Sequence, residues 1–240
     1  MIYIIIPIYN EEQNILNLKN DLNNFLFEDV YTIIFSDDGS TDNTKKEISI
    51  HFSEHKHVVL GDGINRGPGA AFNNGFEYVL SNSLNDEDII VTIEADCTSD
   101  LAILSNMIKL NKMNYSLVLA SVYAQGGGFE ETSFIRKLIS SIANLLFRFV
   151  FDVKVLTISS FYRVYSVKLL RDIKKSKGHL ITEKGFICML EILMKAINCN
   201  AKIIEVPMVL KSSKRKGKSK MKILKTIIDY IKFLIRMKIK

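Results

Sequence analysis

Four polar clusters in the first hundred residues carry the side chains most able to do chemistry. They read PIYNEE (7–12), SDDGSTD (36–42), NRGPGAA (65–71) and EAD (94–96). Glu94 and Asp96 stand one residue apart, so they can offer carboxylate oxygens to a hard divalent cation such as Mg²⁺ or Mn²⁺. Bound there, such a cation would neutralise a diphosphate.

The other clusters suit the remaining parts of a nucleotide. Asp37 and Asp38 can accept hydrogen bonds from ribose hydroxyls or base N–H groups. Gly67 and Gly69 allow a ligand to approach the backbone closely at the start of a helix. Each cluster alone also has a structural explanation, since DDGS is a turn with a helix cap and NRGPG a tight loop. The sequence lacks GxxxxGK[ST], and no GxGxxG follows the first apolar run, so P-loop and Rossmann dinucleotide sites lose their main support.

The elements that carry these clusters alternate between short apolar runs and helical periodicity. Buried strands are predicted at 2–8, 31–36, 58–60, 89–94 and 116–121, and helical spacing of apolar residues recurs within 15–26, 70–78 and 103–110. This alternation predicts an α/β fold with a doubly wound, mostly parallel sheet. Ligands of such sheets bind beyond the carboxyl ends of the strands, where the four clusters lie.

Length, charge and cysteine content limit the class of protein. The 240 residues suffice for one sizeable core, and the high apolar content argues against disorder. Residues 211–240 hold 12 Lys or Arg and one acid, a net charge of +11, whereas residues 1–210 hold 20 Lys or Arg and 25 acids, a net charge of −5. Three scattered cysteines without CxxC favour a reducing compartment. His51, His55 and His57 cluster without converging acids, so no metal site is expected there.

The order and spacing of the clusters resemble the motifs of family-two glycosyltransferases, which have the A-type (GT-A) nucleotide-diphosphosugar transferase fold. The second half of the chain is similar to the dolichol-phosphate mannose synthase branch, which acts on polyprenyl phosphates. The segments that carry this similarity are SVY (121–123) with GG (126–127), RKLIS (136–140) with AN (143–144), SSFYRVY (159–165), EVP (205–207) and GKSK (217–220). The resemblance covers nearly the whole chain.

The resemblance implies a role for each matching residue. The donor nucleotide sugar would be bound by Pro7, Tyr9, Glu11, Asp37, Asp38, Asn65, Gly67 and Glu94. The metal would be held by Asp96, Glu94 and Thr98. The acceptor phosphate would be bound by Arg136, Ser140, Arg163, Lys214 and Lys220, with Asp96, Arg136 and Arg163 as the catalytic residues. Arg136, Arg163 and Lys220, with the hydroxyl of Ser140, come from distant segments, and such a set suits a phosphate better than a neutral sugar hydroxyl.

Several residues depart from the family pattern. Glu94 and Thr98 replace the first Asp and the Gln of D-A-D-x-Q, and Val122 replaces an Arg. Thr157 stands in place of an Asp and Phe161 in place of a Gly. Lys214, with Arg215 beside it, stands three residues before Gly217 in place of an Arg. These departures define a divergent subgroup, and they leave the sugar and the acceptor open.

The implied reaction is inverting transfer of a sugar from a nucleotide-diphosphosugar to a polyprenyl phosphate. Such an acceptor is already anionic at pH 7 and needs no general base. A glycan or other hydroxyl acceptor is the first alternative, and it would require a base, for which Asp152 and Glu183 are weak candidates. An anionic-lipid or nucleic-acid binding protein on a degenerate fold is the second. The basic segment lacks interleaved aromatic residues, so nucleic acid is not expected as a partner.

The organisation follows from these patterns: a glycosyltransferase domain at 1–210, with a nucleotide-sugar half (1–121) and an acceptor half (122–210), and a basic loop with an amphipathic membrane-proximal helix at 211–240. Residues 211–220 are expected to order over phosphates, or else to form a solvated linker. The helix is expected at a membrane interface, or else docked on the core. No run reaches the 18 apolar residues of a membrane span. The expected location is the inner, cytoplasmic face of the membrane. GDP or UDP as donor nucleotide, lipid length and oligomeric state stay open.

Overall fold

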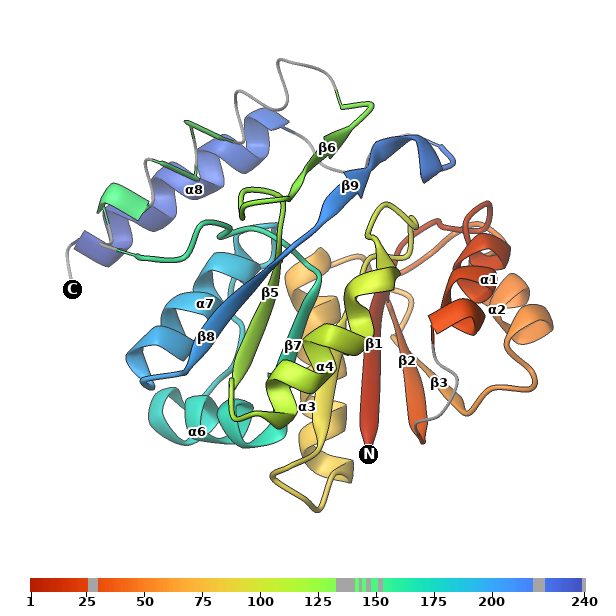
Figure 1. Cartoon of the computed structure of the whole chain (residues 1–240). Helices are drawn as coiled ribbons and strands as arrows, with labels where there is room; N and C mark the ends of the chain where they lie inside the picture. Colours follow the sequence, from red (N-terminus) through yellow and green to blue (C-terminus); the bar gives the residue numbers. More distant parts are fainter. Residues whose placement is uncertain are drawn as a thin grey trace.

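The computed structural model describes residues 1–25, 30–132, 141–142, 144–145, 148–150, 153–217 and 223–238. A central sheet is covered by helices on both faces (Figure 1). Its strands, in spatial order, are β3 (His57–Leu60), β2 (Tyr31–Asp37), β1 (Ile2–Ile8), β4 (Ile89–Thr92), β7 (Arg163–Ser166), β5 (Leu117–Ser121) and β8 (Ile203–Pro207). This arrangement confirms the predicted α/β fold with its mostly parallel sheet.

The helices in chain order are α1 (Ile15–Phe25), α2 (Thr44–His51), α3 (Pro68–Asn82), α4 (Leu104–Lys112), α6 (Val167–Lys177), α7 (Cys188–Asn198) and α8 (Ile223–Lys238). Two short 3₁₀ turns are η1 (Leu101–Ile103) and η2 (Ser212–Lys214). A second sheet pairs β6 (Gly128–Glu130) in parallel with β9 (Val209–Lys211). The predicted division of the chain at residue 210 stays a prediction, and β9 runs across that position.

The central strands are apolar throughout because they are buried on both faces. β1 is parallel to β2 and to β4, and Ile5 lies opposite Ile34 and Thr92. Alternate β1 side chains enter opposite layers: Ile5 packs in the cluster formed with α3, α6 and α7, and Ile4 in the cluster formed with α1 and α4. The alternation places the carboxyl ends of β1, β2 and β4 at one edge of the sheet, as expected.

The structure differs from the predicted elements at the end of β4 and at β6, β7, β8 and β9, which were not predicted. β4 ends at Thr92 rather than at residue 94, so Glu94 lies in a loop beyond the sheet. β7 was missed, and it runs antiparallel between β4 and β5 with Val164 opposite Val91. Its four residues are too few to show periodicity, and they begin with an arginine. β7 is therefore too short, and too polar at its first residue, to be recognised as a strand from the sequence.

Helix α8 packs one face against the body of the protein. Phe233 is 4% exposed in the cluster that also contains helices α6 and α7, and Tyr230 packs beside it. Arg236 forms an ion pair of 2.7 Å with Glu183. Docking on the core, one of the two alternatives, therefore accounts for this face. No helix in the described part of the chain has the length and apolar character needed to cross a bilayer.

Candidate active site

The loops that follow β1 and β2 are tied together by side chain to backbone hydrogen bonds. Asn10, whose φ is +54°, accepts the N–H of Thr41 at 2.8 Å through its amide oxygen. The hydroxyl of Thr44 accepts the N–H of Glu11 at 2.7 Å. These contacts explain the dense Asn, Asp, Ser and Thr content of both loops, because short polar side chains satisfy backbone groups that no strand or helix pairs. The result is one joined platform above the sheet.

Asp37 lies at the base of this platform. Its Oδ1 accepts the N–H of Ser40 at 3.0 Å, and Lys45 Nζ lies 2.9 Å from its Oδ2. Burial by itself would raise the pKa of Asp37, but hydrogen bonds from Ser40 and Lys45 outweigh it and hold that pKa below its ordinary value. Asp37 is therefore ionised at neutral pH, and its contact with a nucleoside stays a prediction.

Asp38 has a structural task that the sequence prediction missed. Its Oδ1 accepts the N–H of Arg66 at 2.7 Å, and the N–H of Gly67 lies 2.8 Å from its Oδ2. Burial raises the pKa of Asp38, and these two N–H groups oppose that rise. Asp38 thus closes the loop around residues 65–67 onto the end of β2. Its contact with a nucleoside stays a prediction.

Gly67 and Gly69 make room for the protein's own backbone, and the close approach of a ligand to them stays a prediction. A Cβ on Gly69 would lie 1.8 Å from the carbonyl oxygen of Glu183, and one on Gly67 would lie 2.4 Å from that of Lys184. The N–H of Gly69 donates to Lys184 O at 2.9 Å, and Gly67 has a φ of +96°. The two glycines therefore join the start of α3 to the segment that precedes α7.

We expect Gly69→Ala to lower the free energy of unfolding by about 1–3 kcal/mol or more, because the obstructing oxygen belongs to backbone that cannot rotate away. Gly128→Ala is the matched control, since a Cβ there meets nothing within 4 Å. Urea unfolding of both variants measures the difference. A Gly69→Ala protein within about 0.5 kcal/mol of the parent would contradict this packing role.

The predicted acid pair lies together after β4. Asp96 Oδ1 accepts hydrogen bonds from the N–H and the hydroxyl of Thr98, at 3.1 and 2.8 Å, and Glu94 Oε2 lies 3.4 Å from the hydroxyl of Ser99. Thr98 therefore orients Asp96. Metal binding by Thr98 stays a prediction. Burial and the nearby charge of Asp96 raise the pKa of Glu94 well above its ordinary value.

This donor set fits a hard divalent cation. Two carboxylates held close together repel one another, and a cation between them would relieve that repulsion. Mg²⁺ typically uses one or two carboxylates and takes its other ligands from water and substrate phosphates. Among the described residues no group of three or more His, Cys, Asp or Glu could hold a metal by itself. Glu94 and Asp96 thus suit a cation that a diphosphate helps to bind.

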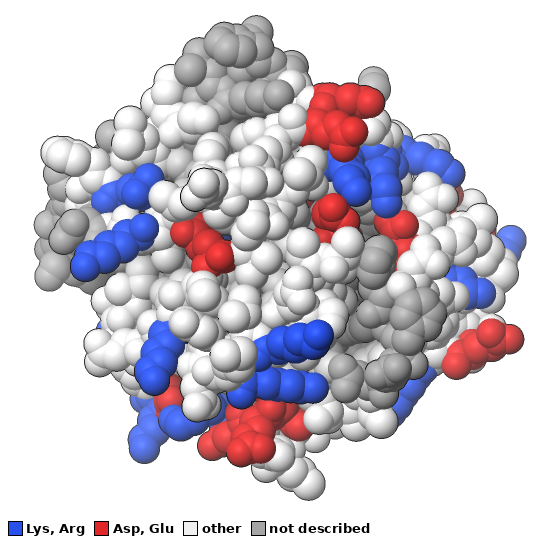
Figure 2. Space-filling view, in the orientation of Figure 1, with Lys and Arg blue, Asp and Glu red and all other residues white. Residues whose placement is uncertain are grey.

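Residues 211–217, which we call the basic strap, are ordered across this acid pair. Its contacts are Lys211 Nζ to Asp100 at 3.2 Å, Lys211 N–H to Thr98 O at 2.9 Å, Lys214 Nζ to Asp21 at 3.0 Å, Arg215 Nε to Asp96 Oδ2 at 2.6 Å, and Lys216 N–H to Asn14 Oδ1 at 2.9 Å. Figure 2 shows blue and red side chains side by side in the region where β9 and η2 lie in Figure 1. Residues 211–217 are thus docked on the body, which contradicts the solvated-linker alternative for them.

Arg215, rather than the predicted Lys214, reaches the acid pair. Lys214 points to Asp21 of α1, which is an exposed surface contact. Arg215 contacts Asp96 through both Nε and Nη2. The adjacency of these two basic residues was visible in the sequence, but only the path of η2 decides which of them faces inward. Phosphate binding by Lys214 stays a prediction.

Arg163 lies in the core, which differs from its predicted place at a phosphate. It is 0% exposed, and Nε donates to Ser160 O at 2.7 Å, Nη1 to Met189 O at 2.9 Å and Nη2 to Ile158 O at 2.9 Å. No carboxylate pairs with it in the part of the chain that the structure describes. Its guanidinium holds the segment before β7 against the start of α7. The geometry therefore favours a positioning role over a direct phosphate contact.

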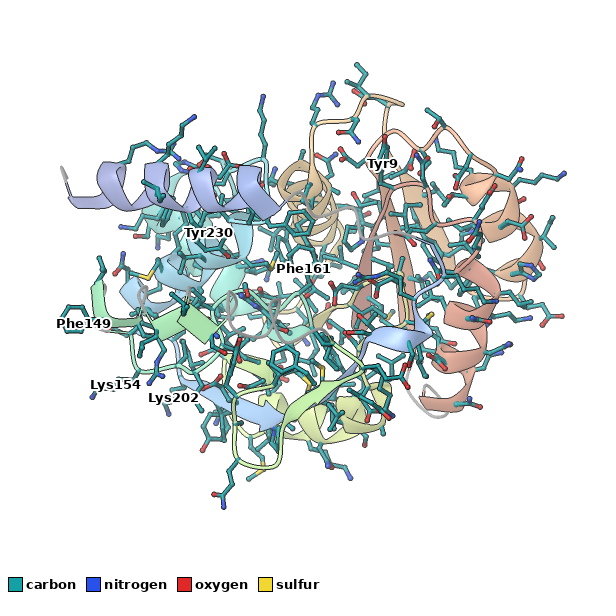
Figure 3. All side chains as sticks on the ribbon, turned by 90° about the horizontal axis from the view of Figure 1, so that it is seen from above. Tyr9, Phe149, Lys154, Phe161, Lys202 and Tyr230 are labelled. Atoms are coloured by element: carbon teal, nitrogen blue, oxygen red, sulfur yellow. The ribbon has the colours of Figure 1, made fainter. Side chains whose placement is uncertain are left out.

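The structure describes four of the remaining predicted site residues, and the other three lie outside the described residues. Pro7 pairs with Ser36 in the sheet, Glu11 accepts Asn14 Nδ2 at 2.6 Å, and Asn65 is exposed. Tyr9 rises beyond the end of β1 and is labelled in Figure 3, which views the site from above. The predicted acceptor residues Arg136, Ser140 and Lys220 lie outside the described residues.

Two departures from the family pattern have clear local partners. Thr157 shares a 2.6 Å hydrogen bond with the hydroxyl of Ser121, and its N–H donates to Glu205 at 2.8 Å. Phe161, labelled near the centre of Figure 3, stacks on Phe186 with ring centroids 5.4 Å apart. Both side chains are therefore held by contacts within the protein.

Similar proteins are found both in sequence and in structure. The dolichol-phosphate mannosyltransferase of Pyrococcus furiosus is 28% identical over 238 residues, which are 98% of this chain and 62% of that protein. The polyprenol monophosphomannose synthase of Mycolicibacterium smegmatis is 27% identical over 221 residues, 91% of this chain and 80% of that protein. The chain thus spans less than two thirds of the Pyrococcus protein.

Solved structures share the fold at lower sequence identity. Glucosyl-3-phosphoglycerate synthase from Mycobacterium tuberculosis, crystallised with Mn²⁺, uridine diphosphate and glucosyl-3-phosphoglycerate, superposes with a TM-score of 0.68 at 17% identity. The superposition covers 98% of this chain and 77% of that one. The family model described as glycosyl transferase family 2 matches residues 3–174, which include β1, the acid pair and β7. The chain therefore belongs to glycosyl transferase family 2.

Proposed function

We propose that this chain transfers a sugar, with inversion, from a nucleoside-diphosphosugar to a polyprenyl phosphate. The observation that carries the proposal is the sequence similarity across 98% and 91% of the chain to two enzymes named for dolichol phosphate and polyprenol monophosphate mannosylation. The platform after β1 and β2 and the acid pair after β4 are consistent with a nucleotide donor.

The donor half of the site would act mainly through charge. Asp37, ionised and fixed by Ser40, would accept hydrogen bonds from the nucleoside. Glu94 and Asp96 would hold a divalent cation, either Mg²⁺ or Mn²⁺, whose chemistry is to stabilise the negative charge that develops on the departing diphosphate. Mn²⁺ is bound in the superposed synthase structure, which supports a divalent ion in general and leaves the choice of metal to experiment.

The acceptor half would align an oxygen that is already nucleophilic. A monoalkyl phosphate has a second pKa near roughly 6, so it is mostly dianionic at pH 7 and needs no general base. Arg136, Ser140 and Lys220, proposed from the family motifs, would bind its oxygens, and alignment with the anomeric carbon would supply much of the rate. Arg163 would support this half indirectly by fixing residues 158–160.

The choice of donor is tested by a screen of GDP- and UDP-linked sugars for hydrolysis or binding, with Mg²⁺, Mn²⁺ or EDTA. We expect one nucleotide to bind in a metal-dependent manner and EDTA to abolish that binding. Equal binding of every nucleotide with EDTA present would contradict a metal-assisted donor site. Adding a prenyl phosphate or a sugar acceptor to the same assay separates the phosphate acceptor from the hydroxyl alternative.

We further propose that α8, together with the exposed Phe149, contacts the inner face of an anionic membrane. Ile228 and Ile231 are each 50% exposed on α8, and Phe149 is 86% exposed. Exposed apolar side chains beside basic residues such as Lys232 are the pattern of an interfacial helix. A lipid acceptor would then meet the site without leaving its bilayer.

Three cations of the basic strap are paired with acids, which leaves less free positive charge for binding nucleic acid.

Ile231→Glu is expected to lower binding to anionic liposomes about tenfold, because it removes apolar burial and adds a charge that the lipids repel. Leu84→Glu is the matched control, since Leu84 is 97% exposed in the loop after α3, at the opposite end of the molecule from α8 (Figure 1). Co-sedimentation with phosphatidylglycerol vesicles measures both. Equal losses of liposome binding in the two variants, or no loss in either, would contradict the proposal that α8 contacts the membrane.

A further inference from the structure

Asp96 gives both of its carboxylate oxygens to protein donors. Oδ1 accepts the N–H and the hydroxyl of Thr98, while Oδ2 accepts Nε of Arg215 at 2.6 Å and also contacts its Nη2. The side chain of Asp96 is 10% exposed and that of Arg215 is 23% exposed, so water screens this pair less than a surface pair. A divalent cation on Asp96 would need the oxygen that Arg215 occupies.

The position of Arg215 is set by the backbone around it. Asn14 forms two hydrogen bonds with the next residue, accepting the N–H of Lys216 at 2.9 Å and donating to its carbonyl oxygen at 3.1 Å. Upstream, the N–H of Lys211 donates to Thr98 O at 2.9 Å. These clamps lie on either side of Arg215: one joins the strap to the loop that carries Asp96, and the other joins it to the segment before α1. The contact is therefore part of an ordered arrangement rather than one conformation of a free side chain.

The charge of the site favours only one cation at this oxygen. A guanidinium and a divalent ion on the same carboxylate oxygen would lie within a few ångströms of each other, where like charges repel strongly when partly buried. Either cation can therefore satisfy Oδ2 of Asp96, but each would exclude the other.

We propose that Arg215 and a divalent cation compete for Asp96, so that metal binding displaces the basic strap from the acid pair. Arg215 thus sets the affinity of the site for the metal. The consequence for catalysis rests on the proposed function: a displaced strap presents its lysines and Arg215 to the anionic groups of donor or acceptor. The competition itself involves only the metal and this chain, so it holds or fails independently of sugar and acceptor.

Direct measurement of Mn²⁺ affinity tests the competition. Arg215→Gln is expected to bind Mn²⁺ at least about fivefold more tightly than the parent in calorimetry or by loss of the free Mn²⁺ resonance signal, because a charge-assisted contact no longer has to break. Lys214→Gln is the matched control, since it removes one charge from the basic strap at Asp21 and leaves Asp96 untouched. It is expected to leave Mn²⁺ affinity within about twofold of the parent. Affinity unchanged or weakened in Arg215→Gln would overturn the proposal.

Limited trypsin digestion of the unaltered chain provides a second readout that needs no variant. Cuts after Lys214, Arg215 and Lys216 are expected to become several-fold faster with saturating Mn²⁺, because the docked strap resists cleavage and the displaced one does not. The cut after the exposed Lys177 at the end of α6 normalises any effect of Mn²⁺ on the protease. Cuts in the basic strap that stay slow at saturating Mn²⁺ would show that both cations bind together, which contradicts competition.

Discussion

Asp96→Asn is expected to lower sugar transfer by roughly 10²- to 10³-fold, the scale on which removing one electrostatic group from a reaction site acts. The substitution removes the charge that would hold the divalent cation, while the amide oxygen still accepts from Thr98. The fold should persist, because residue 96 lies in a loop beyond β4 and forms no part of the sheet. Initial rates with the preferred donor, together with circular dichroism, measure both effects.

Asp100→Asn is the control for this expectation. Asp100 follows the same strand and pairs with Lys211 of the basic strap at 3.2 Å, but it makes no contact with Asp96 in the described structure. Its substitution is expected to change turnover by less than about fivefold, as for a surface ion pair. Comparable losses in both variants would show that general charge near the basic strap, rather than Asp96, supports turnover. Full activity in the Asp96→Asn protein would contradict a role for Asp96 in binding the metal.

Arg163→Met is expected to lower the free energy of unfolding by about 3–5 kcal/mol, the largest stability effect that we expect. The substitution keeps an apolar stem but leaves the carbonyl oxygens of Ile158, Ser160 and Met189 buried without a donor. Arg163→Lys should restore only part of the loss, because one ammonium cannot reach three carbonyls arranged around a planar guanidinium. Urea unfolding of both variants gives the magnitude.

Arg66→Met is the control that tests whether loss of an exposed arginine also destabilises the protein. The guanidinium of Arg66 is exposed and pairs with Asp62 at 2.7 Å, so the unfolding midpoint of the Arg66→Met protein should barely move. A stable Arg163→Met protein that loses affinity for prenyl phosphate would instead support the predicted contact of Arg163 with the acceptor phosphate. A destabilised protein whose acceptor KM is unchanged would establish the positioning role.

The sequence was most informative where apolar runs alternate with polar clusters. All five predicted strands are present, because buried parallel strands such as β1 need uninterrupted apolar residues that are easy to recognise. The convergence of Asp37 and Glu94 at one edge followed from parallel topology alone. β6, β7 and β9 were missed, since three or four residues give too little periodicity and their pairing partners lie far away in the chain. β8 was missed because Glu205 and Pro207 interrupt its apolar run.

The roles of individual side chains were harder to predict, because they depend on what packs beside them. An arginine in a motif looks the same in sequence whether it faces a phosphate or, like Arg163, three backbone carbonyls. Gly69 looks the same whether a ligand or Glu183 approaches it. Lys214 and Arg215 differ only in the direction that η2 gives them. Tertiary contacts decide each case, and those of Gly69, Lys214 and Arg215 join segments more than a hundred residues apart.

The central claim, sugar transfer to a polyprenyl phosphate, is tested most directly by identifying the product. The chain, a short prenyl phosphate, the donor that binds in the screen and Mn²⁺ are incubated together, and the prenyl species are then weighed by mass spectrometry. A parallel reaction contains the matching prenol, which has a hydroxyl in place of the phosphate. The account predicts a prenyl phosphate heavier by one sugar residue and an unchanged prenol. Glycosylated prenol with unchanged prenyl phosphate would contradict it.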